Sequence, residues 1–275
     1  MSAAVFFAIL FAAVLHAGWN AVVKLGLDRF SSIMLLALVQ GAIALALIPF
    51  FAPPDRAAWP WLLAGSALHS GYKLFLIRAY EQGDLSRVYP VARGTAPLIV
   101  AIAGAIFLAE IPSAARGAAI LAIAGGILTM AGGGGLSPRA LLWALGTAGF
   151  TAAYTLADGV GARLSGSASG FALWLFALDG LAMLLIGLFT RGGRAIRGLA
   201  PAWRSGTAAA AMSLGSYWIA IWAFTQAPLA TVAALRETSV LFAMLIAAVW
   251  LREQIGPRGW AAGALILAGI VLMRL

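Results

Sequence analysis

Long apolar segments, separated by short polar breaks, run through the whole chain. The breaks collect Gly, Pro, Ser and charged residues, as in APPDRAA and REQIGPRG, and such clusters are typical of short turns. About 20 apolar residues cross a bilayer as a helix. We therefore predict an all-α polytopic membrane protein with ten transmembrane helices and both termini on one side. The predicted spans are residues 3–24, 32–51, 59–80, 85–109, 114–131, 140–158, 169–190, 206–226, 230–251 and 259–273.

The composition supports lipid as the surrounding solvent. Of the 275 residues, 63% are hydrophobic and only 10% are charged, and the mean hydropathy is +0.98. A water-soluble domain of this length could not bury so much apolar surface. The net charge of +9 would suit nucleic acid, but the basic residues fall between apolar segments, where Arg and Lys commonly flank membrane helices. We therefore predict the lipid bilayer, and no nucleic acid, as a partner.

Several kinds of chemistry are unsupported by the sequence. The chain has no cysteine, which excludes disulfides and thiolate metal sites. It has two histidines, no H-E-x-x-H and no G-x-x-x-x-G-K-[ST], so neither a zinc hydrolase nor ATP-driven chemistry is indicated. The apolar N-terminus lacks a basic leading segment, and we interpret it as a first membrane helix rather than a cleaved signal. We expect no cofactor, no metal and no enzymatic activity.

The second half of the chain repeats the first. LVQGAIALALIPF aligns with ALDGLAMLLIGLF, and RGTAPLIVAIAGAIFLAE aligns without gaps with RETSVLFAMLIAAVWLRE. Apolar residues alone could match by chance, but an Arg-x-Thr start and a final Glu at equal spacing are harder to dismiss. The alignment pairs Gln40 with Asp179, Gly41 with Gly180, Arg93 with Arg236, Thr95 with Thr238, and Glu110 with Glu253.

Each half contains five predicted helices, and this odd number has a topological consequence. The second half must enter the membrane from the opposite side, which makes the halves inverted repeats. We place the first repeat at residues 1–131, a linker at 132–139 and the second repeat at 140–275. Many secondary transporters have this architecture, with the substrate site near the midplane between the repeats.

The fourth and fifth helices of each half carry a more specific resemblance. APLIVAIAGAIFLAEIPSAARGAAILAIAGGILTM and VLFAMLIAAVWLREQIGPRGWAAGALILAGIVLM each join an apolar run ending in Glu to a Gly-rich helix. They resemble the EamA-type branch of the drug/metabolite transporter superfamily and, within it, the aromatic amino-acid exporters of the YddG type. The resemblance implies a multi-pass exporter of amino acids or related metabolites in a bacterial inner membrane. The second half lacks the proline found at Pro97, so we expect no kink there.

Two arginines are the first candidates for a substrate site. Arg93 and Arg236 each lie 17 positions before the final Glu of their segment, too deep for ordinary loop residues. A guanidinium facing a cavity offers a forked donor to a carboxylate. The alternative is a structural arginine that binds backbone carbonyls or extends to the interface. Glu237 follows Arg236 and would either meet a substrate ammonium or balance Lys73 or Arg93.

Polar residues within other helices extend the candidate site. Asp179 lies mid-way along its span and would bind a proton, an ammonium group or a neighbouring helix. His16, Asn20 and Lys24 recur every four residues beside Trp19, which predicts one polar face directed at a bundle interior. A lone histidine is more often a hydrogen-bonding residue than a metal ligand.

The stretch LHSGYKLFLIRAY places three cations in a membrane helix, although each costs roughly 2.5–3.5 kcal/mol at the bilayer centre. His69, Tyr72, Lys73 and Tyr80 share one helical face. We therefore predict a cavity wall, with Lys73 opposite Glu237 or Asp179. Other aromatic side chains inside helices would line the same cavity for a flat, amphipathic substrate, or simply pack helices. These are Tyr154, Trp174, Tyr217, Trp218 and Trp222.

These features favour a secondary transporter, an exporter or exchanger of small amphipathic metabolites such as aromatic and other amino acids, working by alternating access. The alternatives are a carrier of drugs or other metabolites, a channel, or a membrane-embedded enzyme. Small residues four apart, as at Gly259 and Gly263, predict tight packing within one chain, so we expect a monomer. Counting Arg and Lys in the loops would place both termini outside, whereas the family resemblance implies both inside.

Overall fold

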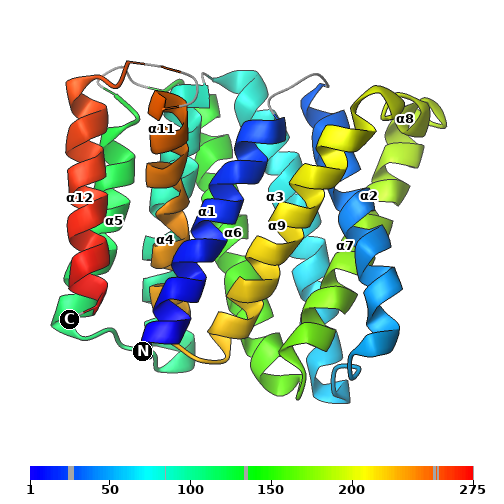
Figure 1. Ribbon diagram of the computed structural model, residues 1–275, viewed down its shortest axis with the longest axis horizontal. Coiled ribbons are helices and arrows are strands. Elements are labelled where there is room, and N and C mark those ends of the chain that lie inside the picture. The colour runs from blue at the N-terminus through cyan, green and yellow to red at the C-terminus, as the bar shows by residue number, and fades with distance from the viewer. Residues whose placement is uncertain (24–27, 84, 133–135, 250–251, 253, 275) are drawn as a thin grey trace.

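A computed structural model of the chain describes residues 1–23, 28–83, 85–132, 136–249, 252 and 254–274. These residues are almost entirely helical, and they contain no strand. The long helices stand side by side, and both termini lie at the same face of the bundle (Figure 1). The predicted all-α class and the placement of the termini on one side are therefore confirmed.

The first half contains five long helices and two short 3-10 turns. These are α1 (Ala3–Val23), α2 (Arg29–Leu47), η1 (Ile48–Phe50), η2 (Arg56–Ala58), α3 (Trp59–Gln82), α4 (Leu85–Leu108) and α5 (Ala114–Thr129). The second half contains α6 (Pro138–Leu164), α7 (Ala168–Arg191), α8 (Arg194–Arg197), η3 (Ala200–Ala202), α9 (Trp203–Phe224), α10 (Leu229–Glu237), α11 (Ser239–Val249) and α12 (Pro257–Arg274).

Helices begin where the polar breaks supply a capping side chain. Asp28 accepts a hydrogen bond from the backbone N–H of Ser31 and starts α2. Ser113, Ser137 and Ser167 cap α5, α6 and α7 in the same way. Each cap satisfies a backbone donor that the first helical turn leaves without a partner. The turn residues thus fix where the apolar segments enter the bundle.

Seven helical segments within the described residues are long and apolar enough to cross a bilayer, which identifies a multi-pass integral membrane protein. α5 is apolar but only 16 residues long. α3, which carries Lys73 and Arg78, and α12 also fall outside this group. The count of ten spans therefore stays a prediction. Lys24, Trp250 and Leu251, at the ends of two predicted spans, and Glu253 lie outside the described residues.

One predicted helix boundary is wrong. α6 continues to Leu164, so Asp158 lies inside the helix rather than at its end. α10 and α11 meet at the single residue Thr238, which keeps right-handed helical backbone angles, and together they form one apolar segment, Leu229–Val249, long enough to cross a bilayer. At this junction the Thr238 hydroxyl donates to the carbonyl oxygen of Leu235 at 2.6 Å.

α4 runs without interruption through both Pro90 and Pro97, so neither proline ends the helix. The expected difference in kinks between the fourth helices of the two halves stays a prediction. In the second half, the polar residues at the junction of α10 and α11, Glu237, Thr238 and Ser239, are all buried among the other helices.

The repeat predicted from the sequence is visible as a reciprocal contact between α2 and α7. A Cβ added to Gly41 would lie 3.3 Å from the carbonyl oxygen of Phe176. A Cβ added to Gly180 would lie 2.9 Å from the carbonyl oxygen of Ala37. Gly41 and Gly180 are equivalent in the repeat, and so are Ala37 and Phe176, one position before the aligned segments. The contact of Gly41 with Phe176 is therefore equivalent to the contact of Gly180 with Ala37. A two-fold axis that exchanges the two halves would exchange these two contacts.

A second reciprocal contact joins α5 and α12. Gly126 lies against the carbonyl oxygen of Ala262, and Gly269 lies against that of Ala119. Continuing the gapless alignment makes Gly126 equivalent to Gly269, and Ala119 equivalent to Ala262. Symmetric packing also pairs α3 with α6 and their counterparts α9 with α1. The two halves are thus related by a pseudo-two-fold axis, and their equivalent helices run antiparallel.

Candidate functional site

Charged contacts between helices concentrate where the two halves meet. Among the described residues, every ion pair except Arg78–Glu81 joins a residue of the first half to one of the second. The five contacts are His69–Asp158, Lys73–Asp179, Arg93–Glu237, Glu110–Arg163 and Asp28–Arg191. The first three are buried inside the bundle. Movement of one half against the other would therefore have to break or rearrange them.

Arg93 of α4 and Glu237 of α10 form the most enclosed of these pairs. Arg93 Nε lies 2.7 Å from Glu237 Oε2, and each side chain is only 5% exposed. The pair is a close ion contact rather than a well-aligned hydrogen bond, and Arg93 also approaches His16 Nε2 at 3.4 Å. The sequence predicted either Lys73 or Arg93 as the partner of Glu237, and in the structure the partner is Arg93. Burial makes the mutual charge balance essential, because either ion alone would be costly.

Arg236 introduces a charge that this pair does not balance. The residue is 7% exposed, and its guanidinium carbon lies 4.6 Å from the centroid of the Tyr217 ring. Within the described part of the chain it makes no hydrogen bond and no ion pair. Arg93, Arg236 and Glu237 together carry one net positive charge. An anionic group bound beside Arg236 would neutralise this positive charge. It would also accept hydrogen bonds from the forked N–H groups of the guanidinium.

The junction of α10 and α11 lies beside these charges. Arg236 and Glu237 form the last turn of α10, and Thr238 alone separates that helix from α11. The backbone N–H groups of Leu241 and Phe242 both donate to the Thr238 carbonyl oxygen, so the two helices continue one another. Arg236 and Glu237 are therefore held within one membrane-length helical segment.

Two polar residues of the predicted face of α1 form hydrogen bonds within α1 itself. Trp19 Nε1 donates to His16 Nδ1 at 3.3 Å, and Asn20 Nδ2 donates to the His16 carbonyl oxygen at 2.8 Å. His16 reaches α4 through its contact with Arg93, and Trp19 packs against the cluster of Leu36, Ala209 and Ala210 on α2 and α9. Of the predicted face, His16 thus belongs to the charged cluster, while Trp19 and Asn20 orient it. Lys24, the remaining member, lies outside the described residues.

Lys73 of α3 and Asp179 of α7 are paired side chain to side chain, both almost fully buried. The sequence predicted Asp179 or Glu237 as the partner of Lys73, and in the structure the partner is Asp179. The pair explains how a membrane helix accommodates an ammonium group, because the carboxylate replaces the lost hydration. Asp179 is therefore occupied by a neighbouring helix in this structure.

A third polar cluster lies one turn away on α3. His69 Nε2 is 2.8 Å from Asp158 Oδ2, and the Tyr217 hydroxyl donates to the same oxygen at 2.5 Å. The His69 ring stacks on Tyr154 with ring centroids 4.0 Å apart, and Tyr72 packs edge-on against Tyr154. Three of the predicted aromatic residues, Tyr72, Tyr154 and Tyr217, are therefore brought together here.

Asp158 was not among the residues predicted from the sequence. The predicted span ended at this residue, which made it resemble a helix-end carboxylate facing water. In the structure it is fully buried in the continuous helix α6. The signal lay in LADGVGARL, where four uncharged residues, Gly, Val, Gly and Ala, separate Asp158 from Arg163. Extending the helix to the first charged residue beyond Asp158 would have placed the carboxylate inside the membrane.

The remaining predicted aromatic residues lie apart from these charged clusters. Trp174 packs against Trp59, and Trp218 donates its indole N–H to Ser169 at 2.9 Å. Trp222 is 37% exposed. Tyr80 lies under the guanidinium of Arg29, near the end of α3. Their contacts are those of helix packing or of the membrane interface, and none of them touches Arg93, Arg236 or Glu237.

A further polar cluster closes the turn between α9 and α10. Arg163 Nη1 lies 2.6 Å from Glu110 Oε1, and Glu110 Oε2 accepts the backbone N–H of Leu229 at 2.7 Å. Arg163 also donates to the carbonyl oxygens of Phe224 and Ala227. These contacts tie the ends of α4, α6 and α9 to the start of α10. They join the two halves at the face where the termini lie.

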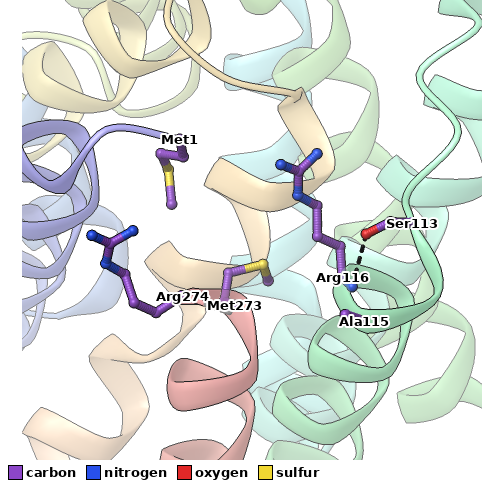
Figure 2. Close-up of a pocket in the computed structure, with 6 residues that line it drawn as sticks. All are labelled: Met1, Ser113, Ala115, Arg116, Met273 and Arg274. Atoms are coloured by element: carbon purple, nitrogen blue, oxygen red, sulfur yellow. Dashed lines mark hydrogen bonds between the residues drawn. The ribbon is translucent and has the colours of Figure 1, made fainter.

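A small cavity lies at the same face but away from the ion pairs. Figure 2 shows Arg116 and Arg274 beside Met1, Met273, Ser113 and Ala115, around a cavity of about 210 Å³. Arg116 donates its backbone N–H to the capping Ser113 hydroxyl. In the described residues, no group of three or more His, Asp or Glu side chains is placed to hold a metal ion.

Comparison with known proteins bears on the arrangement as a whole. The EamA-like transporter family matches residues 3–132 and again residues 138–275. The chain belongs to the EamA-like transporter family. The two matches cover both halves of this EamA-like transporter, in agreement with the reciprocal glycine contacts. The family lies within the drug/metabolite transporter superfamily, and its members are transporters rather than enzymes.

Other comparisons bear only on the fold of this EamA-like transporter. No curated protein sequence matches it. A solved structure described only as "Crystal structure of protein" superimposes with a TM-score of 0.79, covering 100% of this chain and 99% of that chain. The sequence identity is 17%, so the likeness supports the architecture and carries no substrate.

Proposed function

We propose that this EamA-like transporter is a secondary carrier, an exporter or exchanger, of amino acids including aromatic ones, and that it works by alternating access. In this proposal α3, α5 and α12 complete ten membrane spans in a plasma membrane. The observation that carries the proposal is the buried cation Arg236, which has no ion-pair partner among the described residues and lies over Tyr217 in the last turn of α10. An amino-acid carboxylate is a small anion that matches its forked donors.

Two features beside Arg236 support an amphipathic substrate. Tyr217, Tyr154 and Tyr72 form an aromatic group whose faces and edges would accept an apolar or aromatic side chain. Glu237 is the only carboxylate in the Arg93–Arg236 cluster of described residues, and it would attract the substrate ammonium group. The two charged groups of a zwitterionic amino acid would therefore face opposite charges on Arg236 and Glu237, which are adjacent at the end of α10.

The distribution of ion pairs supports alternating access. All five inter-helix pairs among the described residues cross from one half to the other. In inverted-repeat transporters, one repeat or bundle moves against the other around a site between them. Pairs at this boundary hold the present arrangement, and their exchange for other partners would permit the opposite one.

The proposal is tested by counterflow in proteoliposomes containing the purified chain, loaded with one unlabelled amino acid at a time. We expect saturable uptake of the same labelled amino acid for at least one of the proteinogenic set. Counterflow without an imposed gradient distinguishes a carrier from a channel. No counterflow with any amino acid would contradict the proposal.

The site assignment is tested in the same assay with Arg236→Ala and a matched control, Arg78→Ala. Arg78 is exposed and paired only within its own helix, so its removal should leave flux unchanged. Removing the charged donor of Arg236 should reduce flux at least about tenfold, because a hydrogen bond to a charged group contributes roughly 1.5–3 kcal/mol. Equal flux in Arg236→Ala and the wild type would show that the carboxylate binds elsewhere.

A further inference from the structure

We propose that Asp158, together with His69 and Tyr217, forms a proton-binding site between the two halves, adjoining the substrate site at Arg236 and sharing Tyr217 with it. The three residues come from α6, α3 and α9, so the site joins the first half to the second. The proposal concerns proton uptake by these residues. Only its second experiment rests on the transport function proposed above.

The Asp158 carboxylate lies in a buried environment with few hydrogen-bond donors. The residue is fully buried, and its Oδ2 atom contacts both the imidazole of His69 and the hydroxyl of Tyr217. Its Oδ1 atom has no hydrogen-bond partner within the described residues and faces Gly65. A buried carboxylate with one oxygen free of donors is costly as an anion. The free oxygen is also an available position for a proton.

The Asp158 carboxylate has no permanently charged partner. In the described part of the chain, no Lys or Arg forms an ion pair with it. On α3 the nearest cation, Lys73, is already paired with Asp179 of α7. The partners of Asp158 are His69, which carries charge only when protonated, and the neutral Tyr217. The charge of the cluster is therefore set by a proton rather than by a fixed ion pair.

The helices around Asp158 contribute further charged and titratable groups. α4 contributes Arg93, balanced by Glu237 of α10, and Tyr89, whose ring lies beneath Arg93. α6 contributes Tyr154, stacked on His69, and α3 contributes Tyr72. α10 also contributes Arg236, which contacts the Tyr217 ring and forms no ion pair with Asp158 in the described residues. Since Arg236 is a fixed charge, the His69–Asp158 pair is the group whose charge a proton can change.

The proton transfer itself is simple. The pair without an added proton has a carboxylate and a neutral imidazole, with a net charge of −1. One proton taken from water forms a single new N–H or O–H bond, on the imidazole or on the free carboxylate oxygen, and the net charge becomes zero. Release to water reverses the step, and no other bond forms or breaks. The His69 side chain is 14% exposed, whereas that of Asp158 is fully buried, so His69 is the more accessible member of the pair.

The position of Tyr217 connects this site to the substrate site. Its hydroxyl donates to Asp158, while its ring lies under the guanidinium of Arg236. A change of charge on either side of the ring is felt on the other, because both lie in a medium of low dielectric constant. By linkage, occupancy of one site then changes affinity at the other, and the effect is reciprocal.

The first experiment needs no substrate. The purified full-length protein in detergent is titrated between about pH 5 and 9, the range in which histidine pairs commonly change charge, and carboxyl protonation is followed by infrared difference spectroscopy. We expect a carboxylic-acid or imidazolium signal that titrates in the wild type and is absent in Asp158→Asn. Glu81→Gln, which removes an exposed carboxylate of the same helix α3, is the control and should leave the signal unchanged.

Two further variants keep the test decisive if Asp158→Asn fails to fold. Tyr217→Phe removes a donor to the carboxylate, so its titration should differ from that of the wild type. His69→Gln removes the imidazole, so the imidazolium contribution should vanish. A titration identical in the wild type and these variants, or no titration in the wild type, would overturn the proposal.

The second experiment measures counterflow of L-phenylalanine at several pH values. We expect the pH dependence of the wild type to be lost in Asp158→Asn while counterflow itself persists. The two proposals fail separately. Counterflow without a titration at Asp158 would overturn the proton site and leave the carrier standing. A titration at Asp158 without counterflow of any amino acid would overturn the carrier and leave the proton site standing.

Discussion

Gly41 of α2 and Gly180 of α7 occupy equivalent positions in the two halves and pack directly against each other. A Cβ added to Gly41 would lie 3.2 Å from the Cα of Gly180. Two equivalent residues can touch each other only near the axis that relates them. The pseudo-two-fold axis therefore passes through the crossing of α2 and α7, and small residues at this crossing allow the two backbones to approach.

The first prediction concerns this crossing. Gly180→Ala places a methyl group 2.9 Å from the backbone carbonyl oxygen of Ala37, which cannot rotate away. We expect a loss of about 1–3 kcal/mol in the free energy of unfolding, as for other overpacked sites. Gly149→Ala in α6 is the matched control, because nothing lies within 4 Å of its added Cβ. That variant should be neutral or slightly stabilising.

Thermal unfolding in detergent, followed by tryptophan fluorescence, measures both variants. A Gly180→Ala midpoint equal to that of Gly149→Ala would show that the two backbones are farther apart than described.

The second prediction concerns Lys73 and Asp179. Removing either member alone leaves a buried charge without its partner, and we expect each of Lys73→Met and Asp179→Leu to lose about 3–5 kcal/mol of stability. The double variant leaves no charge behind and should recover most of that loss. A double-mutant cycle on unfolding midpoints makes the measurement. Additive losses in the double variant would mean that the two side chains are not coupled.

The third prediction concerns the cluster at the turn between α9 and α10. Arg163 holds two backbone carbonyl oxygens and Glu110, so Arg163→Ala should loosen this turn. The chain has no native cysteine, which allows a single Ala227→Cys probe on a clean background. We expect thiol labelling of buried Ala227→Cys to accelerate at least about tenfold, because each charge-assisted bond contributes roughly 1.5–3 kcal/mol.

Arg56→Ala serves as the control for that measurement, since Arg56 is an exposed arginine in η2, outside the turn between α9 and α10. It should leave the labelling rate unchanged. Equal acceleration by both arginine variants would indicate a general charge effect rather than release of the turn.

The fourth prediction is a dependence on pH at the opposite face. Burial raises the pKa of Asp28, but hydrogen bonds from Ser31 and the guanidinium of Arg191 outweigh it, and the pKa lies below its ordinary value. A lowered folded-state pKa means that the stabilisation is present above the unfolded value, about 3.9, and is lost as the pH falls through the folded value. Asp28→Asn should therefore narrow the stability difference between neutral and acidic pH.

The size of this effect is small. Both side chains are substantially exposed, so solvent screens the pair, and we expect on the order of 0.5 kcal/mol at neutral pH. Unfolding midpoints of wild type and Asp28→Asn, measured at low salt from neutral pH downward, provide the comparison. A wider difference in the variant would reverse the sign and contradict the assignment.

Much of the architecture follows from short-range rules that the sequence displays. Apolar runs of bilayer length and capping residues at the breaks define the helices. The paired glycines, arginines and glutamates reveal the repeat, because equal spacing of polar residues is rare in apolar sequence. Lys73 was expected to meet a carboxylate, and it meets Asp179. Burial of a cation leaves few other solutions.

The parts that escaped prediction depend on tertiary context. The end of α6 was placed too early because a charged residue usually marks a helix end. Asp158 is instead tolerated inside by donors from α3 and α9 that are distant in sequence. The contact of Arg93 with Glu237 likewise could not be distinguished from one with Lys73, because it depends on how α4 and α10 pack.

The central claim, that Arg236 receives the carboxylate of an amphipathic substrate, is tested most directly by competition. Counterflow of labelled L-phenylalanine in proteoliposomes is measured with unlabelled L-phenylalanine or with phenethylamine, which keeps the ring and the ammonium group but lacks the carboxylate. We predict that L-phenylalanine competes and phenethylamine does not, and that Arg236→Ala loses the distinction. Equal competition by the two compounds in the wild type would contradict the account.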